Sequence, residues 1–236
     1  MFAETPQGPQ TMGAGERHAR HRHRGAYAAL VLRGSYEEAG IGGRFHLREG
    51  DILFHAAFEG HRDHIGANGA AILNLPLPPD AAIGFTLARH RAFDRLVALA
   101  GRDLGEAAAL LRDAAEPVAV SVSDWPDMLV RDLWRDPRLS LSCWSARNGL
   151  APETLSRGLG RLYGVTPAAL RGEIRAHKAW TALMRTTKPL ATLAADMGFA
   201  DQAHMTRAIT RLTCHPPGHW RRIHQLARPS IRTSVQ

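Results

Sequence analysis

Cysteines are scarce in this sequence, and long apolar runs are missing from it. It has only two cysteines, Cys143 and Cys214, which excludes a disulfide framework and a zinc site built from close cysteine pairs. This usage fits a reducing cytoplasm, where we expect the protein to reside. No run approaches the roughly 18 apolar residues of a membrane span, so we expect no membrane partner. Residues 1–24 have no apolar signal-peptide core, and we expect them to be a flexible N-terminal segment.

Acidic residues are scarce in the C-terminal part of the chain. Residues 137–236 contain 15 Lys and Arg but only 4 Asp and Glu, whereas residues 1–136 contain 15 and 18. The overall formal charge of +8 is therefore concentrated in one segment. Such an excess favours a polyanion as partner, although an ordinary basic surface is an alternative that charge alone leaves open.

The first part of the chain is rich in short apolar stretches separated by turn residues. Strands are expected at 26–32, 44–47, 52–54 and 70–75, the first ended by Arg33-Gly34-Ser35. This pattern predicts a small β-barrel or sandwich over residues 25–88.

The next stretch changes from strand to helix spacing. Apolar residues recur at helical intervals between residues 90 and 115, which predicts two helices within a helical linker or dimerisation region, 89–123, and a homodimer. Asp124 followed by Pro126 then predicts the start of another helix.

Residues 124–227 contain an approximate repeat with an offset of about 50 residues. The two copies are SCWSARNGLAPETLSRGLGRLYG and TLAADMGFADQAHMTRAITRLTC. In each copy a short helix ends near a glycine, Gly149 or Gly198, and a longer amphipathic helix follows. This is the spacing of a helix–turn–helix unit, so we expect an all-α domain with two of them, followed by a flexible tail over 228–236.

The longer helix of each copy has an apolar face and a polar face. In the first, Leu155, Leu159 and Leu162 are expected to point inward; in the second, Met205, Ile209 and Leu212 are. The remaining side chains could enter a major groove, where Arg reads guanine and Gln reads adenine. These candidate DNA-binding residues are Glu153, Thr154, Ser156, Arg157 and Arg161 in the first copy, and Gln202, Ala203, His204, Thr206, Arg207 and Arg211 in the second.

Two stretches of this repeat resemble a known family. ETLSRGLGRLYGVTPAALRGEIR and GFADQAHMTRAITRLTCHPPGHWR look like the signature of AraC/XylS-family transcription regulators. The resemblance implies two helix–turn–helix units joined by a long helix, here about Pro167 to Thr187, with Arg157 and Arg207 at positions that commonly contact DNA. Four positions depart from the family pattern: Ser145, Ala151, Ala203 and Cys214. Ala151 leaves the first recognition helix without a side-chain N-cap, at a cost of about 1 kcal/mol.

The N-terminal zone resembles the cupin-like sensor domain that many members of this family carry. The resemblance rests on His21-Arg22-His23, the turn Glu49-Gly50-Asp51 and Phe58-Glu59-Gly60-His61. It implies a transition-metal site formed by His21, His23 and His61, with His55 as a substitute ligand. No Glu follows His23 at the usual cupin distance. Two alternatives stay open: the stretch RHARHRHR could be a basic arm that touches phosphates, or the barrel could hold a pocket without metal.

The sequence thus predicts an α+β two-domain protein, with an N-terminal cupin-like β-barrel and a C-terminal all-α domain. Its expected function is that of a sequence-specific, double-stranded-DNA-binding transcription regulator, controlled by a small-molecule effector or a metal in the barrel. It would contact RNA polymerase if it is an activator. A metal-dependent cupin enzyme with a helical extension is the alternative, but an enzyme has no need of two helix–turn–helix units, so we expect no catalytic activity.

Overall fold

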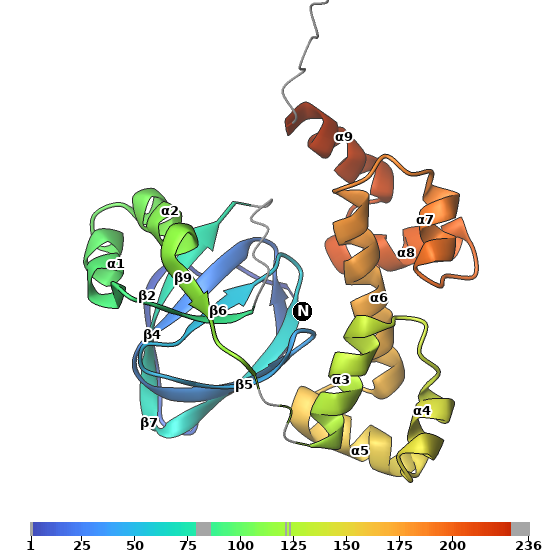
Figure 1. The fold of residues 1–236 in the computed structure, drawn as a ribbon, viewed down its shortest axis with the longest axis horizontal. Coiled ribbons are helices and arrows are strands. Elements are labelled where there is room, and N and C mark those ends of the chain that lie inside the picture. Colours follow the sequence, from blue (N-terminus) through green and yellow to red (C-terminus); the bar gives the residue numbers. More distant parts are fainter. Residues whose placement is uncertain (1, 79–85, 121, 123, 228–236) are drawn as a thin grey trace, which may run out of the picture. The chain divides into compact units, whose positions relative to one another are not determined.

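The computed structural model in Figure 1 describes residues 2–78, 86–120, 122 and 124–227. The expected tail, 228–236, lies outside the described residues. The chain forms two compact units, residues 1–170 and 171–236. The charge and repeat pattern had suggested a boundary before residue 124 instead. Within the described residues, no helix is both long and apolar enough to cross a membrane.

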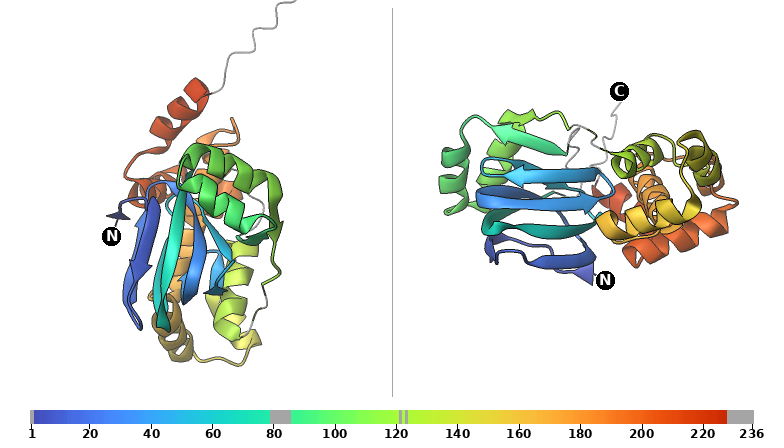
Figure 2. Two further views of the ribbon diagram at one scale, coloured as in Figure 1. Left: turned by 90° about the vertical axis from the view of Figure 1, so that its left-hand side faces the viewer. Right: turned by 90° about the horizontal axis from the view of Figure 1, so that it is seen from below.

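The first unit contains one strongly curved, mostly antiparallel sheet (Figure 2). Its strands are β1 (Phe2–Ala3), β2 (Gly8–Met12), β3 (Arg17–His23), β4 (Ala26–Gly40), β5 (Gly43–Arg48), β6 (Ile52–His55), β7 (Gly60–Leu77), β8 (Leu87–His90) and β9 (Ala115–Pro117). The order along the sheet is β1-β3-β7-β4-β6-β8-β9, with β2 also paired to β7 and β5 to β4. The ends of this path do not pair within the described residues, so the barrel is open.

The N-terminal segment 1–24, which we expected to be flexible, contributes three of these strands. β3 pairs with β7 at Arg17↔His64 and His21↔His61, and β2 pairs with the later part of β7. β3 shows no apolar alternation because both of its faces carry His or Arg. The expectation was wrong because backbone pairing, and not a burial pattern, holds this segment on the sheet.

Two long strands, β4 and β7, form the centre of the sheet. We expected β4 to end at Arg33-Gly34-Ser35, but the strand continues to Gly40 through register shifts around this point. Gly34 has φ +79°, and a Cβ there would lie 2.0 Å from the carbonyl oxygen of Gly69. The backbones of β4 and β7 therefore approach so closely here that only glycine fits at position 34. The glycine that suggested a turn in the sequence lies instead at a β-bulge, which bends the strand.

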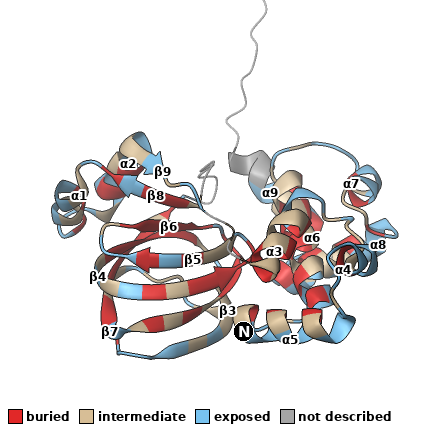
Figure 3. Ribbon diagram, turned by 60° about the horizontal axis from the view of Figure 1, so that its bottom comes forward, coloured by how far each residue is buried: buried red, intermediate tan, exposed pale blue. Residues whose placement is uncertain are grey.

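Buried apolar side chains are concentrated on β4, β6 and β7, as the red segments in Figure 3 show. The two helices expected between residues 90 and 115 are present as α1 (Phe93–Ala100) and α2 (Leu104–Ala114), and they bury Leu96 and Leu111. The strand β9 then pairs with β8 and returns the chain to the sheet.

The helix–turn–helix segments follow the predicted pattern closely. The helices are α3 (Trp125–Arg135), α4 (Leu141–Arg147), α5 (Pro152–Tyr163), α6 (Pro167–Leu183), α7 (Leu190–Asp196), α8 (Gln202–Thr213) and α9 (Pro217–Ala227). Asp124 is the N-cap residue of α3, as expected. The joining helix α6 is four residues shorter than the expected range, and the boundary between the two compact units falls inside it.

Candidate nucleic-acid interface and metal centre

The first helix–turn–helix unit consists of α4 and α5. Trp144 of α4 is buried and donates a hydrogen bond from its indole nitrogen to Asp132 Oδ2 at 2.9 Å. Gly149, with φ +63°, allows the turn between the helices. Leu155 and Leu159 of α5 are buried as predicted. These contacts fix which face of α5 points outward.

The inward face of α5 differs from the prediction at its C-terminal end. Leu162, expected to be inward, is only half-buried, whereas Tyr163 is completely buried. The Tyr163 hydroxyl donates to Asp127 Oδ1 of α3 at 2.7 Å. Burial, together with this hydrogen bond, raises the pKa of Tyr163. The phenol is therefore a neutral donor at the end of the helix.

Asp127 also connects the first helix–turn–helix unit to the sheet. Arg44 of β5 donates to Asp127 Oδ2 at 2.9 Å and to Asp124 Oδ2 at 3.0 Å. The Arg44 and Asp127 side chains are only 10% and 9% exposed. The buried Asp127 carboxylate thus pairs with Arg44 and also accepts the Tyr163 hydrogen bond. These contacts hold the first helix–turn–helix unit against the sheet, within one compact unit.

The second helix–turn–helix unit consists of α7 and α8. Met205, Ile209 and Leu212 are buried, as predicted. Asp201 is the N-cap residue, and its carboxylate accepts a hydrogen bond from the backbone N–H of His204 at 2.6 Å. At the other end, Cys214 has a left-handed backbone with φ +63°. Core and caps together leave the opposite face of α8 in solvent.

The candidate DNA-binding residues lie on the outward faces of the two recognition helices. Thr154 and Thr206 are half-buried and all the others are exposed: Glu153, Ser156, Arg157 and Arg161 on α5, and Gln202, Ala203, His204, Arg207 and Arg211 on α8. Each face offers cationic and hydrogen-bonding side chains on a rigid helix. Such a face can contact both phosphates and base edges.

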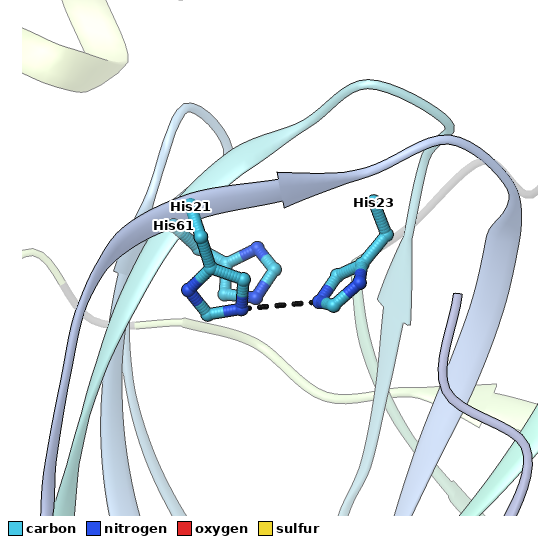
Figure 4. A group of neighbouring side chains, drawn as sticks. All are labelled: His21, His23 and His61. Carbon is cyan, nitrogen blue, oxygen red and sulfur yellow. Dashed lines mark hydrogen bonds between the residues drawn. The ribbon is translucent and has the colours of Figure 1, made fainter. Parts of the chain in front are cut away.

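The sheet brings the predicted histidine ligands together. Figure 4 shows His21 and His23 projecting from β3 toward His61 of β7. One ligand atom from each of the three lies within 4.8 Å of the other two. His23 and His61 are buried and His21 is half-buried. The Nε2 atoms of His21 and His23 are 3.1 Å apart. Two nitrogens bound to one metal at about 2.1 Å lie at about this separation.

Backbone carbonyls determine which nitrogens of this cluster are free to bind a metal. Nδ1 of His21 donates to the carbonyl of Ala19 at 3.0 Å, and Nδ1 of His23 donates to that of Glu4 at 2.5 Å. A carbonyl can only accept, so in the neutral rings both protons are on Nδ1 and both Nε2 atoms carry lone pairs. Two facing lone pairs repel each other unless a cation lies between them. This hydrogen-bonding pattern is typical of metal-binding histidines.

Three further side chains extend the cluster. Glu38, His55 and His61 form a second group whose ligand atoms also lie within 4.8 Å of one another. Burial lowers the pKa of His55 to about 3 and holds that of His61 well below its usual value, so both rings are neutral. Among the described residues, Nδ1 of His61 is buried without a hydrogen-bond partner. The donor set thus fits a transition-metal ion, with His55 or Glu38 able to complete the coordination.

Glu38 is the member of this cluster that sequence reasoning missed. The expected cupin Glu would follow the HxH pair closely, whereas Glu38 lies on the next strand, 15 residues after His23. It is 3% exposed, and burial raises the pKa of its carboxyl group, with nearby Asp63 and Glu59 adding to the effect. Glu38 lies two residues after Tyr36, so on a strand both side chains point to the same face. An acidic residue on the same face as a large aromatic one was the signal that could have identified it.

Comparisons with known proteins agree with this description of the C-terminal part. Residues 144–223, about a third of the chain, match a family model described as a helix-turn-helix domain. No curated protein matches the sequence.

Three solved structures illustrate the structural similarities. The C-terminal domain of AraT, a response regulator from Geobacillus stearothermophilus, is 21% identical, with 50% of this chain and 97% of that chain covered and a TM-score of 0.42. Fatty-acid-bound ToxT from Vibrio cholerae is 9% identical, with 90% and 93% covered and a TM-score of 0.41. Salicylate 1,2-dioxygenase from Pseudoaminobacter salicylatoxidans is 20% identical, with 28% and 20% covered and a TM-score of 0.27.

The matched domain and the two helix–turn–helix units define the class of protein. The chain carries a helix–turn–helix domain over residues 144–223, preceded by a sheet-rich domain. It is a DNA-binding transcription regulator.

Proposed function

We propose that this regulator binds double-stranded DNA through the outward faces of α5 and α8, and that a transition metal in the sheet-rich domain controls the binding. The observation that supports the DNA-binding part is the exposure of Arg157 and Arg207 at matching positions of two buried-core helix–turn–helix units. Residues 124–227 serve as the DNA-binding part of the chain, and the sheet with α1 and α2 serves as the sensor.

The metal part of the proposal rests on the histidine cluster. His21, His23 and His61 would hold the ion, with His55 or Glu38 as a fourth ligand. A bound divalent ion would supply positive charge and fixed coordination geometry that tie β3 to β7. We propose this as a regulatory role and not a catalytic one, because the chain devotes two helix–turn–helix units to DNA.

Assembly and location complete the proposal. A homodimer, formed through the α1–α2 region, would pair two DNA-binding parts on one operator. Contact with RNA polymerase would follow if the protein is an activator. A protein that binds the chromosome in this way acts in the cytoplasm.

A salt titration tests the DNA-binding part. The full-length protein should bind a labelled duplex selected from a random pool, and log Kd should rise linearly with log salt, with a slope of about 0.9 per phosphate contact. Fluorescence anisotropy measures both. Failure to bind any selected duplex at low salt would refute this part.

Elemental analysis tests the metal part. Protein purified without an affinity tag should retain Zn, Fe, Ni, Cu or Mn, and the triple variant His21→Ala, His23→Ala, His61→Ala should not, while unfolding cooperatively like the wild type. Replacement of the exposed His46 by Ala is a matched control that should leave the metal content unchanged. A wild type with none of these metals, which also fails to bind added Zn²⁺ in equilibrium dialysis, would leave the sensor as a pocket for an organic effector.

A further inference from the structure

Arg20 and Arg62 are sequence neighbours of two histidines of the cluster. Arg20 precedes His21 on β3, and Arg62 follows His61 on β7. Successive side chains of a strand point to opposite faces, so each arginine lies on the face opposite to that of its neighbouring histidine. His21 is paired with His61, and the register of β3 with β7 shifts between His18 and His21, so Arg20 and Arg62 lie on neighbouring strands beside this pair.

Both arginines contact the C-terminal end of the first recognition helix. Nη1 of Arg20 donates to the carbonyl of Tyr163 at 3.1 Å, and Nη1 of Arg62 donates to the carbonyl of Arg161 at 2.6 Å. These carbonyls belong to the last turn of α5, which has no intrahelical donors for them and carries the negative end of the helix dipole. Two guanidinium groups therefore satisfy and stabilise this helix end.

The residue after α5 lies close to both arginines. Gly164 ends the helix with φ +67°, and a Cβ there would lie 3.4 Å from Cδ of Arg62 and 3.6 Å from Cβ of Arg20. The helix end thus lies directly against the two strands. The face of α5 that carries Ser156 and Arg157 remains exposed while this contact is made.

Arg20 is also within electrostatic reach of the histidine cluster. Burial and the neighbouring histidines lower the pKa of His61, and the charge of Arg20 adds to this effect. The same charge acts on Glu38 in the opposite sense to burial.

We propose that Arg20 and Arg62 are positioning residues that fasten the C-terminal end of α5 to the two strands carrying the histidine cluster, and that metal binding in the cluster changes DNA affinity through this connection. The second part rests on the proposed function. A metal that bridges β3 and β7 alters the spacing of the two strands, and each strand has one guanidinium on the last turn of α5. The first helix–turn–helix unit is thereby coupled to the cluster.

The experiment uses the full-length protein and a double variant, Arg20→Gln with Arg62→Gln. The matched control is Arg24→Gln, an exposed arginine just after β3 whose guanidinium stacks on Phe2. Hydrogen–deuterium exchange is measured at the amides of residues 159–164. Zn²⁺ affinity is measured by equilibrium dialysis, and the Kd for the selected duplex is measured with and without Zn²⁺.

The expected result has two parts. Exchange at residues 159–164 should be faster in the double variant than in the wild type and the control. Zn²⁺ should change the duplex Kd by at least about fivefold in the wild type and the control, but by less than twofold in the double variant, with Zn²⁺ affinity retained.

Two outcomes would overturn the proposal. Unchanged exchange at residues 159–164 in the double variant would show that the arginines do not fasten the helix. A wild-type Zn²⁺ effect on DNA binding that persists in the double variant would show that coupling takes another route, although the proposed function would stand. Absence of Zn²⁺ binding would refute the metal-dependent function instead, and the exchange measurement would then decide the fastening by itself.

Discussion

At the scale of single residues, the two copies of the repeat end their recognition helices in the same left-handed backbone conformation with different side chains. Gly164 has φ +67° after α5, and Cys214 has φ +63° after α8. A side chain other than glycine pays about 1 kcal/mol in this region of backbone space. The backbone is therefore slightly strained at Cys214 but not at the equivalent Gly164.

Replacing Cys214→Gly should stabilise the protein by about 1 kcal/mol, because glycine adopts this conformation without the Cβ clash. The reciprocal change, Gly164→Ala, should destabilise the protein by about the same amount, because it places a Cβ on a left-handed residue with φ +67°. Urea-induced unfolding, followed by circular dichroism, measures both. Equal effects of the same sign would contradict this account of the two helix ends.

Base reading is a prediction at the same scale. Arg157→Ala and Arg207→Ala should each weaken binding to the selected duplex by about 1–3 kcal/mol, and they should weaken binding to an unrelated duplex much less. Arg112→Ala, an exposed arginine on α2, removes the same charge outside both helix–turn–helix units. If all three variants lose affinity equally for both duplexes, these arginines contact phosphates only.

At the scale of elements, the packing of α5 depends on a glycine in the middle of the helix. A Cβ on Gly158 would lie 2.3 Å from the indole ring of Trp125 on α3, whereas a Cβ on Gly160 would meet nothing within 4 Å. Glycine is a poor helix former, so its presence at position 158 is explained by the close approach of the two helices. Gly160 has no such reason in its surroundings.

This difference gives a matched pair of variants two residues apart. Gly158→Ala should destabilise the protein by about 1–3 kcal/mol through overpacking against Trp125. Gly160→Ala should stabilise it by about 0.5–1 kcal/mol, because alanine favours the helix. Thermal unfolding measures the two midpoints. A stabilising Gly158→Ala would mean that α3 and α5 are further apart than described.

The helices could be predicted from the sequence, and several strands could not. Apolar spacing and the caps Asp124 and Asp201 gave α3 to α8 with small errors at their ends. β3 was missed because a period-two pattern needs contrast between polar and apolar residues, and this strand alternates between His and Arg. Likewise, Gly34 signals a turn and a bulge equally well, and only the pairing partner distinguishes them.

The candidate sites followed the same division. The outward faces of α5 and α8 follow from helix periodicity alone, so those residues could be named in advance. Glu38 depends on which strands become neighbours, and the contact between Arg44 and Asp127 joins positions 83 apart. Such long-range pairings leave no local pattern in the sequence.

At the scale of the whole molecule, the acidic residues of α3 determine how firmly the first helix–turn–helix unit is held. Asp127 is buried, and within the described part of the chain its side chain pairs with Arg44 and accepts from Tyr163, whereas the Asp124 side chain is 43% exposed and pairs with Arg44. Asp127→Asn should cost about 2–3 kcal/mol, because a buried guanidinium loses its main counter-charge. Asp124→Asn should cost less than about 1 kcal/mol.

Chemical unfolding of the two variants checks this prediction. The Asp127→Asn variant should also show faster hydrogen exchange in α3 and α5 than the Asp124→Asn variant, since both helices depend on the same carboxylate. Similar losses for the two aspartates would mean that Arg44 and Tyr163 are held by the surrounding packing and not by Asp127.

The pairing of the N-terminal strands has a practical consequence for anyone who shortens the protein. Residues 1–24 read as a dispensable basic arm, yet their removal would strip β2 and β3 from β7 and leave the N–H and C=O groups at Gly60–His64 and Ala70–Asn74 without these partners. An uncovered strand edge is a template for pairing with another chain. A protein starting at residue 25 should therefore self-associate and precipitate instead of gaining order.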